Sequence, residues 1–303
     1  MTSTHPVPSL SPDSPDSAGV SELAILAGKG DYPLLLAQSA RQQGVKRIVA
    51  IAFRHETERA ISRYCDQVHW IYLGQLQAVL DAFRSTGIKH AVMAGQITPT
   101  HLFSLRLDRA ALSMLNRLRE RNAHTIFGAF CDELKGIGLQ LLPAHLFMES
   151  AMPPAGLIAN RSPSSSEESD INLGIQVAKT TSGIEIGQTV VLKQGTILAV
   201  EAFEGTDEAI LRAGRLGGPG IVVVKVAKRG HDMRFDIPVI GTRTLKTLRK
   251  VKAGVLAVEA GRTILLQREE LIRQANRMNL CLTAVPTEDS EPDKAGSPGR
   301  PSP

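Results

Sequence analysis

Aromatic side chains are scarce in this chain of 303 residues, in which Phe, Tyr and Trp make up 4% of the sequence and Trp70 is the sole tryptophan. Proteins that hold single-stranded nucleic acid stack its bases on aromatic rings, so the composition argues against a nucleic-acid partner. The formal net charge of +5 is compatible with a phosphate, a nucleotide or an acidic membrane surface as partner. It is too small to indicate nucleic acid.

Cysteine is also rare, and its spacing excludes the common metal and redox motifs. Cys65, Cys131 and Cys281 lie far apart and form no Cys-x-x-Cys pair. The eight histidines include no His-Glu-x-x-His spacing, and the sequence has no Walker loop or Gly-x-Ser-x-Gly elbow. Zinc enzymes, P-loop ATPases and serine hydrolases are therefore disfavoured, and the cysteines are expected to be reduced.

Long apolar runs are missing as well. No stretch approaches the roughly 18 apolar residues of a transmembrane helix. No Lys or Arg precedes Lys29, so the chain lacks the basic start of a signal peptide. These two absences predict a cytoplasmic protein.

Three segments rich in proline and serine divide the chain. Residues 1–20 and 286–303 hold nine of the seventeen prolines and show no apolar periodicity, which predicts disordered tails. A third break, at 152–170, contains a Pro-Pro pair and three consecutive serines and is predicted to be a linker. The chain is therefore expected to fold as two domains, 21–151 and 171–285.

The first predicted domain alternates short apolar runs with amphipathic stretches. The predicted strands are 23–27, 47–53, 68–72, 91–93 and 139–142, and the predicted helices are 33–43, 56–62, 76–86, 108–121 and 125–135. Such alternation is typical of a parallel sheet with right-handed crossovers. We predict an α/β protein whose N-terminal domain is Rossmann-like.

The second predicted domain is a mixed α/β domain. Its strongest strand pattern is the apolar run 221–226. Further strands are predicted at 189–192, 196–201, 255–259, 263–266 and 281–285, and helices at 171–181, 242–252 and 268–278.

A glycine-containing turn follows the first predicted strand. Gly28 and Gly30 precede Pro33, which suits the first turn of a helix. Backbone N–H groups at such a turn can approach a phosphate, whose charge the helix dipole favours. The pattern is a poor dinucleotide fingerprint, because Pro33 replaces the third glycine and the next strand ends at Arg54 and His55 instead of at an acid. We predict phosphate or nucleotide binding here, with a turn that binds nothing as the alternative.

A second turn follows the strand predicted at 91–93. In an open parallel sheet the carboxyl ends of the strands face the ligand. Gly95, Gln96 and Thr98 can therefore hydrogen-bond a base or a ribose. A turn of this kind is equally common without a ligand.

Three carboxylates lie within seven residues of the second domain. Glu201, Glu204 and Asp207 flank Gly205, which permits a sharp turn, and Thr206. One interpretation is that these residues cap the next helix. The other is a Mg²⁺ site, because Mg²⁺ prefers one or two carboxylates together with phosphate oxygens of a substrate.

A basic segment runs from Lys225 to Lys252, where nine Lys or Arg residues stand against two Asp residues. Such a segment is most often a solvated face. Here Asp236 lies two residues after Arg234, inside the basic stretch. This arrangement suits a carboxylate that binds metal or activates water beside cations that hold phosphate.

Two segments, 200–207 and 234–241, together resemble the signature segments of the LpxI-type UDP-2,3-diacylglucosamine pyrophosphatases. They read Val-Glu-Ala-Phe-Glu-Gly-Thr-Asp and Arg-Phe-Asp-Ile-Pro-Val-Ile-Gly. The likeness covers roughly residues 23–285. At the nucleotide end the chain departs from the family pattern, since it reads Gly-Lys-Gly at 28–30 and lacks an arginine near Thr98, which indicates a divergent branch.

The resemblance implies a Mg²⁺-dependent hydrolase of lipid A biosynthesis that splits UDP-2,3-diacylglucosamine into UMP and 2,3-diacylglucosamine 1-phosphate. It implies that Asp236 is the catalytic aspartate and that Asp207 and Glu204 lie in an acidic turn. We assign Mg²⁺ to these three carboxylates and catalysis to Asp236, Asp207 and Arg234. The expected substrate contacts are Gly28, Gly30, Gly95, Gln96, Thr98, Gly205, Thr206 and Lys225. We expect a cytoplasmic homodimer with weak peripheral contact to the anionic inner membrane.

Two other classes fit parts of the pattern. A nicotinamide-dependent oxidoreductase would use the first domain, but the acid expected after its second strand is missing. A catalytically silent protein that binds a nucleotide or a lipid phosphate would use the same turns. Release of UMP from UDP-2,3-diacylglucosamine, with and without Mg²⁺, distinguishes the hydrolase from both.

Overall fold

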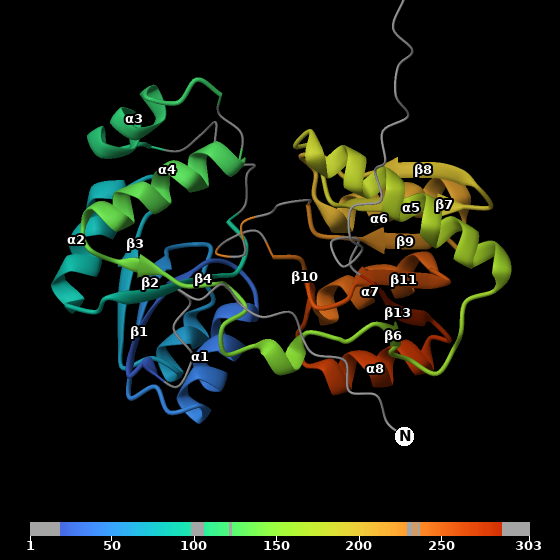
Figure 1. Ribbon diagram of the computed structural model, residues 1–303, viewed down its shortest axis with the longest axis horizontal. Helices are drawn as coiled ribbons and strands as arrows, with labels where there is room; N and C mark the ends of the chain where they lie inside the picture. Colours follow the sequence, from blue (N-terminus) through green and yellow to red (C-terminus); the bar gives the residue numbers. More distant parts are fainter. Residues whose placement is uncertain are drawn as a thin grey trace, which may run out of the picture. The chain divides into compact units, whose positions relative to one another are not determined.

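The chain forms two compact units, each with its own sheet (Figure 1). The computed structural model describes residues 19–97, 106–120, 123–228, 232, 234 and 237–286. Unit 1 comprises the described residues up to Ser150 and those within 230–237, and unit 2 comprises the others. Asp232 and Arg234 thus belong to the compact unit that the N-terminal half forms.

Unit 1 is built on a five-stranded parallel sheet in the order β3-β2-β1-β4-β5. The strands are β1 Glu22–Ala27, β2 Arg47–Phe53, β3 Gln67–Ile71, β4 His90–Ala94 and β5 Gln140–Leu141. The predicted parallel sheet is confirmed. Its strand order reverses between β1 and β4, and open α/β sheets bind their ligands beyond the carboxyl ends of the strands at such a point.

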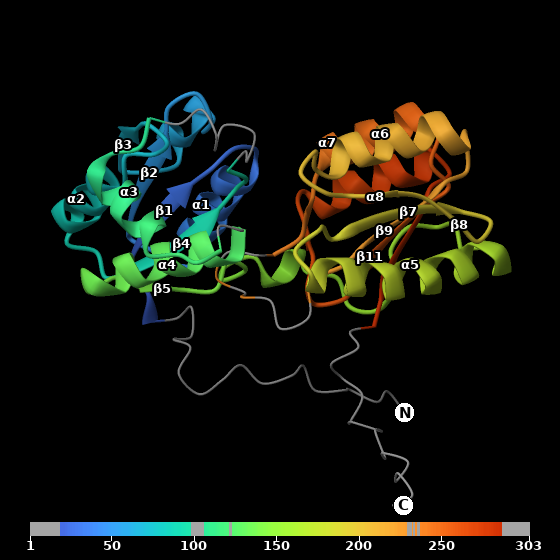
Figure 2. The same cartoon turned by 90° about the horizontal axis from the view of Figure 1, so that it is seen from above.

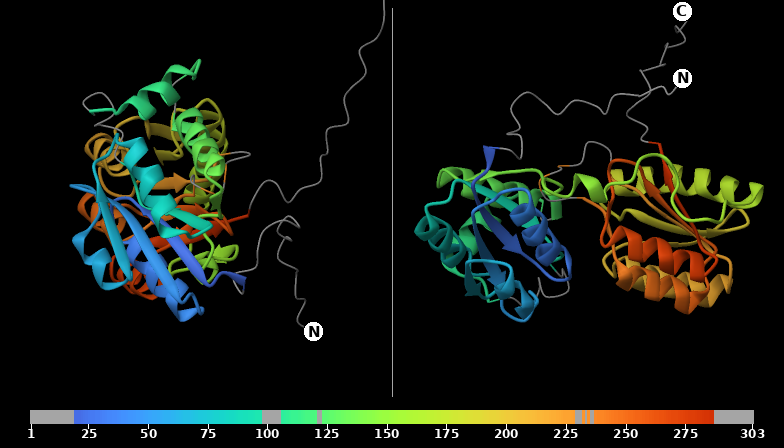
Figure 3. Two further views of the ribbon diagram at one scale, coloured as in Figure 1. Left: turned by 90° about the vertical axis from the view of Figure 1, so that its left-hand side faces the viewer. Right: turned by 90° about the horizontal axis from the view of Figure 1, so that it is seen from below.

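Helices cover both faces of this sheet (Figure 3). They are α1 Tyr32–Gln42, α2 Leu76–Thr86, α3 Arg109–Asn116 and α4 Ala123–Gly136. Apolar residues of α2, α3 and α4 share one core with alternate residues of the strands, among them Leu26 and Ile51. Helix α1 packs against β1 and β4, with Leu36 fully buried.

Residues 56–62 do not form the predicted α-helix. They lead instead into a short 3₁₀ helix at Arg59–Arg63. The Thr57 hydroxyl accepts a hydrogen bond from Phe53 N at 2.9 Å and donates one to the carbonyl of Ala27. These bonds tie the turn to the ends of β2 and β1, so a helix cannot begin at residue 56.

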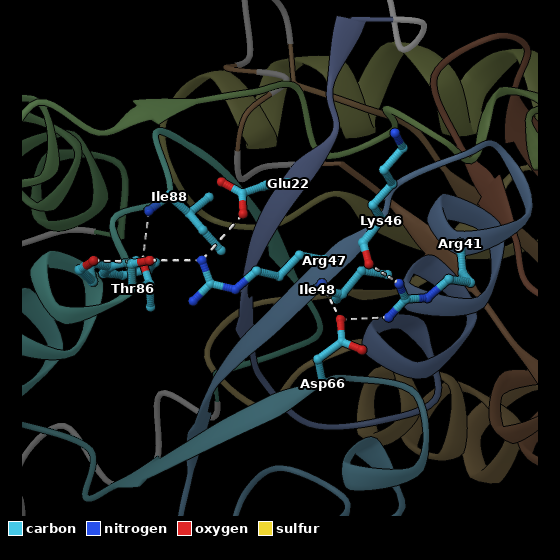
Figure 4. A network of polar contacts seen from close by, with 9 residues as sticks. Glu22, Arg41, Lys46, Arg47, Ile48, Asp66, Thr86 and Ile88 are labelled. Atoms are coloured by element: carbon cyan, nitrogen blue, oxygen red, sulfur yellow. Dashed lines mark hydrogen bonds and ion pairs between the residues drawn. The ribbon is translucent and has the colours of Figure 1, made fainter.

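A polar network on unit 1 joins α1, β2 and the turn before β3 (Figure 4). Asp66 Oδ2 accepts hydrogen bonds from Ile48 N and from Arg41 Nη2, both at 2.7 Å. The bond from the Ile48 backbone, followed by that from Arg41, lowers the pKa of Asp66 below its ordinary value.

We expect Asp66→Asn to lower the free energy of unfolding at pH 7 by about 1 kcal/mol, since the carboxylate is half exposed. Because folding lowers the pKa of Asp66, the ionised group stabilises the fold above its unfolded pKa of about 3.9. That contribution is lost as the pH falls through the folded pKa. Urea unfolding of both proteins at pH 7 and well below pH 3.9 measures this dependence, and an equal deficit at both pH values would contradict it.

Unit 2 holds a six-stranded mixed sheet in the order β6-β13-β11-β9-β7-β8. Its strands are β6 Gly156–Leu157, β7 Thr189–Lys193, β8 Thr196–Val200, β9 Val222–Lys225, β11 Val255–Glu259 and β13 Cys281–Val285. Strands β9, β11 and β13 are parallel, whereas β6, β7 and β8 each run antiparallel to their neighbours. A separate parallel pair joins β10 Val239–Ile240 to β12 Ile264–Leu265. The predicted mixed α/β domain is confirmed.

The helices of unit 2 lie on both faces of its sheet, with α5 on one side and α6, α7 and α8 on the other (Figure 2). They are α5 Ser165–Gly183, α6 Thr206–Gly217, α7 Thr242–Val251 and α8 Arg268–Arg277. Within the described ranges, no helix has both the length and the apolar character of a membrane span.

Residues 152–170, predicted as a linker, contain regular structure. Gly156–Leu157 pairs with β13, and α5 begins at Ser165 instead of at the predicted 171. Ser164 Oγ accepts from Glu167 N at 3.4 Å, and Glu167 Oε2 accepts from Ser164 N at 2.8 Å. This capping box provides partners for the first N–H groups of the helix, so the serine-rich run starts a helix.

Candidate functional site

The two glycine turns of unit 1 lie against each other beyond the ends of β1 and β4. Lys29 N donates to Gln96 O at 2.7 Å, and Gln96 N donates to Lys29 O at 3.1 Å. Gly28 N donates to the carbonyl of Ala94, the last residue of β4, at 2.8 Å. The structure thus brings Gly28, Gly95 and Gln96 together, while Thr98 lies outside the described residues.

Gly28 and Gly95 lie so close to the backbone of the facing turn that neither position has room for a side chain. A Cβ on Gly28 would lie 2.7 Å from Gln96 O, and one on Gly95 would lie 2.8 Å from Lys29 O and 2.9 Å from Pro33 Cγ. Gly95 also has a φ of +90°. Gly30 has a φ of +94°, but no atom would come within 4 Å of its Cβ. At position 30 glycine is therefore favoured only by the positive φ, because a Cβ there would meet no other atom.

We expect Gly95→Ala to lower the free energy of unfolding by about 3 kcal/mol, because the methyl group combines strain at positive φ with contacts to rigid backbone. Gly30→Ala is the matched control, since it introduces the strain without the contacts and should cost about 1–2 kcal/mol. Urea unfolding of both variants measures the difference. If both variants lost the same free energy of unfolding, the prediction would be wrong, and the two turns would be able to move apart to accommodate the methyl group.

Helix α1 begins directly after the first turn. Asp31, the residue before it, makes no side-chain capping bond, and the first turn of α1 contains Pro33 but no acidic residue. The N–H groups of this turn therefore have no side-chain cap, as an anion-binding helix start requires.

Three residues at the same sheet edge escaped the sequence-based assignment. Arg54 and His55 follow β2 and Tyr72 follows β3. The Arg54 guanidinium lies 5.6 Å from the centre of the Tyr72 ring, the His55 ring lies 6.1 Å from it, and Tyr72 is 51% exposed. The sequence could have indicated these residues, because each lies at or just after the end of a predicted strand and the carboxyl ends of parallel strands face the ligand.

A polar network centred on Thr206 lies where β8, α6 and β9 meet in unit 2. Thr206 Oγ1 donates to Glu201 Oε1 at 2.8 Å and accepts from Lys225 Nζ at 3.0 Å. Thr189 Oγ1 lies 3.4 Å from Thr206 Oγ1. Gly205, with a φ of +85°, makes the turn into α6 that places Thr206 there.

The carboxylates around this network differ in their partners. Asp207 Oδ2 pairs with Arg243 Nε at 2.8 Å, while Asp207 Oδ1 and Glu201 Oε2 are buried and have no hydrogen-bond partner in the described part of the chain. Glu204 lies apart, with its oxygens bonded to Arg212 at 2.6 Å and to Ala202 N at 3.1 Å. Burial alone would raise the pKa of Glu204, but hydrogen bonds from its own backbone N–H and from Arg212 outweigh burial and lower it.

Arg234 and Asp232 form an ion pair in unit 1. Arg234 Nε and Nη2 lie 2.9 and 2.6 Å from the Asp232 oxygens, and these bonds raise the pKa of the guanidinium further. The neighbouring thiol of Cys131 on α4 has a pKa that burial raises to about 11, against the opposing charge of Arg234. The predicted catalytic Asp236 lies outside the described residues.

No group of three or more His, Cys, Asp or Glu side chains arranged to hold a metal occurs within the described residues. Asp207 and Glu201 nevertheless each offer one buried carboxylate oxygen without a partner. Mg²⁺ commonly takes one or two protein carboxylates and completes its shell with water and substrate phosphate. These two carboxylate oxygens therefore suit Mg²⁺ better than a metal whose ligands must all come from the protein.

A polar pocket of about 470 Å³ in unit 2 contains none of the predicted site residues. It lies at the start of α5, and its charged side chains are already bonded. Arg161 pairs with Glu167, Asp170 accepts from the N–H groups of Gln194 and Gly195, and Lys193 donates to two carbonyls.

Two α/β units with glycine turns and an acid–cation network define a protein suited to a phosphate-containing ligand. The chain belongs to the LpxI family: the family's N-terminal domain matches residues 22–151, and its C-terminal domain matches residues 154–283.

The chain is also similar to the UDP-2,3-diacylglucosamine pyrophosphatase LpxI of Caulobacter vibrioides. The two are 27% identical over 281 residues, which cover 87% of this chain and 97% of that protein. A similarity to N5-carboxyaminoimidazole synthetase from Staphylococcus aureus complexed with ADP has 10% identity and a TM-score of 0.23, and covers 66% of this chain and 47% of that one.

Proposed function

We propose that the chain hydrolyses the pyrophosphate of UDP-2,3-diacylglucosamine to UMP and 2,3-diacylglucosamine 1-phosphate, a step in lipid A biosynthesis. The observation that carries the proposal is that both domains of the LpxI family match, over residues 22–151 and 154–283. In this reaction water adds to one phosphorus, the bridging P–O bond breaks, and each product keeps one phosphate.

The turns of unit 1 suit the nucleotide end of this substrate. Gly28 and Gly95 bring the two backbone segments together, and Gly30 leaves open space beside α1, whose first N–H groups have no side-chain cap. Backbone N–H groups at a helix start favour phosphate. We assign the nucleotide to this edge, with Gln96 as its neighbour.

The Thr206 network suits the pyrophosphate. Mg²⁺, when bound, would draw negative charge off the phosphate oxygens. We propose that Asp207 and Glu201, with Asp236, hold the ion, because their chemistry fits a hard cation and the first two have buried oxygens to offer. Lys225, which is bonded to Thr206, supplies positive charge for the substrate. Glu204 already holds its own loop and Arg212.

UMP release by the full chain, with Mg²⁺ and after chelation by EDTA, tests the proposal. Asp207→Asn should lower kcat by about tenfold or more, whereas Glu208→Gln, an exposed acid in the same turn of α6, should not. Absence of UMP release by the wild-type chain would overturn the proposed function. Equal rates with and without Mg²⁺ would overturn the role of the metal alone.

We also propose that helix α7 mediates peripheral contact with the anionic inner membrane, from which a diacylated substrate comes. Four exposed cations at the helix and its end form no ion pair with the described residues: Lys246, Arg249, Lys250 and Lys252. Each such cation contributes about 1 kcal/mol near an anionic surface. Their replacement by serine should abolish binding to anionic vesicles, and salt should weaken wild-type binding. Equal binding to neutral vesicles would contradict this. A cytoplasmic homodimer remains our expectation.

A further inference from the structure

A buried ion pair joins α5 to the end of β11. Lys179 Nζ lies 2.8 and 2.9 Å from the two oxygens of Glu259, and the side chains are 3% and 1% exposed. Removing two charges from water costs several kcal/mol for each ion, and apolar replacements of such pairs are often equally stable. Stability alone therefore does not explain why these charges are buried.

Both members of the pair also bind one residue of the backbone. Lys179 Nζ donates its remaining hydrogen bond to Ala227 O at 2.9 Å, and Glu259 Oε2 accepts from Ala227 N at 2.8 Å. The preceding residue is fixed as well, because Val226 N donates to Gln188 O at 3.1 Å. The chain is thus held on both sides of Ala227, two residues after the end of β9.

Ala227 lies close in the sequence to residues of the candidate site. Lys225, two residues earlier, lies in the Thr206 network. The segment that follows contains Asp232 and Arg234, which belong to unit 1, and the predicted catalytic Asp236. Ala227 therefore stands between the two groups of polar residues that the sequence assigns to the reaction.

We propose that Lys179 and Glu259 are positioning residues, which hold Ala227 so that Lys225, two residues earlier, keeps the place in the Thr206 network from which it supplies charge to the pyrophosphate. The proposal rests on the proposed function. Neither side chain need touch the substrate. Misplacement of reacting groups by about 1 Å can cost about 10²-fold in rate, so a restraint on the backbone is sufficient to affect turnover.

Two double variants of the full chain separate positioning from stability. Lys179→Met with Glu259→Leu removes both charges and both bonds to Ala227, and should lower kcat about 10²-fold with little change in KM. Lys179→Met with Glu259→Gln also removes the charges but keeps an oxygen that can accept from Ala227 N, and should retain more of the kcat. The control is Arg161→Met with Glu167→Gln, an ion pair at the start of α5, which should alter Tm but not kcat.

Amide hydrogen exchange gives a second readout that needs no substrate. Peptides that contain Val226 and Ala227 should exchange faster in the Met/Leu variant, while β7 and β8 stay protected. A folded Met/Leu variant with wild-type kcat and unchanged exchange would overturn the proposal. Failure of the wild-type chain to release UMP would overturn the proposed function alone, because the exchange comparison still tests the hold on Ala227.

Discussion

Asp236→Asn is expected to reduce kcat for UMP release by about 10²-fold or more and to leave the chain folded. The pyrophosphate is anionic and repels hydroxide, so its hydrolysis requires positive charge at the phosphate and a carboxylate that binds the metal or orients water. Asparagine keeps the shape of the side chain and removes this charge. Substrate affinity should survive, since the nucleotide is assigned to the turns of unit 1.

The measurement is kcat and KM beside Tm, with Asp81→Asn as the control. Asp81 is an exposed carboxylate of unit 1 that pairs with Arg84 at 2.9 Å. Its replacement should leave both kcat and KM unchanged. A folded Asp236→Asn chain with wild-type, Mg²⁺-dependent release of UMP would remove Asp236 from the reaction and leave Asp207 and Glu201 as the carboxylates to test.

Lys179→Met alone should lower the free energy of unfolding by about 3–5 kcal/mol. The substitution leaves the Glu259 carboxylate buried without its counter-charge, and Ala227 O without its donor. An unpaired buried charge costs far more than the net contribution of the intact pair. The variant that also carries Glu259→Leu should therefore be more stable than the single variant, although it lacks one more polar group.

Urea unfolding of the wild type and these variants tests the expectation. Arg84→Met serves as the control, because the Arg84–Asp81 pair is more than half exposed on both sides. Exposed pairs contribute roughly 0–1 kcal/mol, so little stability should be lost. If Lys179→Met lowered the free energy of unfolding by as little as Arg84→Met does, the expectation would be wrong, and water would have to reach Glu259 in place of the ammonium group.

Local sequence patterns predicted most of the fold. Apolar runs located every strand of the two large sheets except β6, which lies in the predicted linker, since a buried parallel strand needs little more than consecutive aliphatic residues. The pattern failed at residues 56–62, where the hydroxyl of Thr57 donates a hydrogen bond to Ala27 at the end of β1, 30 residues earlier in the sequence. It also failed at Ser164, because a serine-rich run resembles a linker until the reciprocal bonds of its capping box are seen.

The candidate site was predictable only where its residues are close in sequence. The run from Glu201 to Asp207 stood out because three carboxylates surround one turn. Lys179 and Glu259 are 80 residues apart, and each resembles an ordinary surface charge. Only the folded sheet shows that both reach Ala227. Arg54 and Tyr72 likewise become neighbours through the pairing of β2 with β3.

The assignment of Asp232, Arg234 and Ile237 to unit 1 has a consequence for how the chain is made. The N-terminal half leaves the ribosome long before these residues, and residues 151–228, which belong to unit 2, are synthesised in between. Unit 1 therefore cannot be completed in the order of translation. Ribosome-bound chains that stop at residue 150 should lack its last piece, and supplying 230–237 as a separate peptide would be the way to complete them.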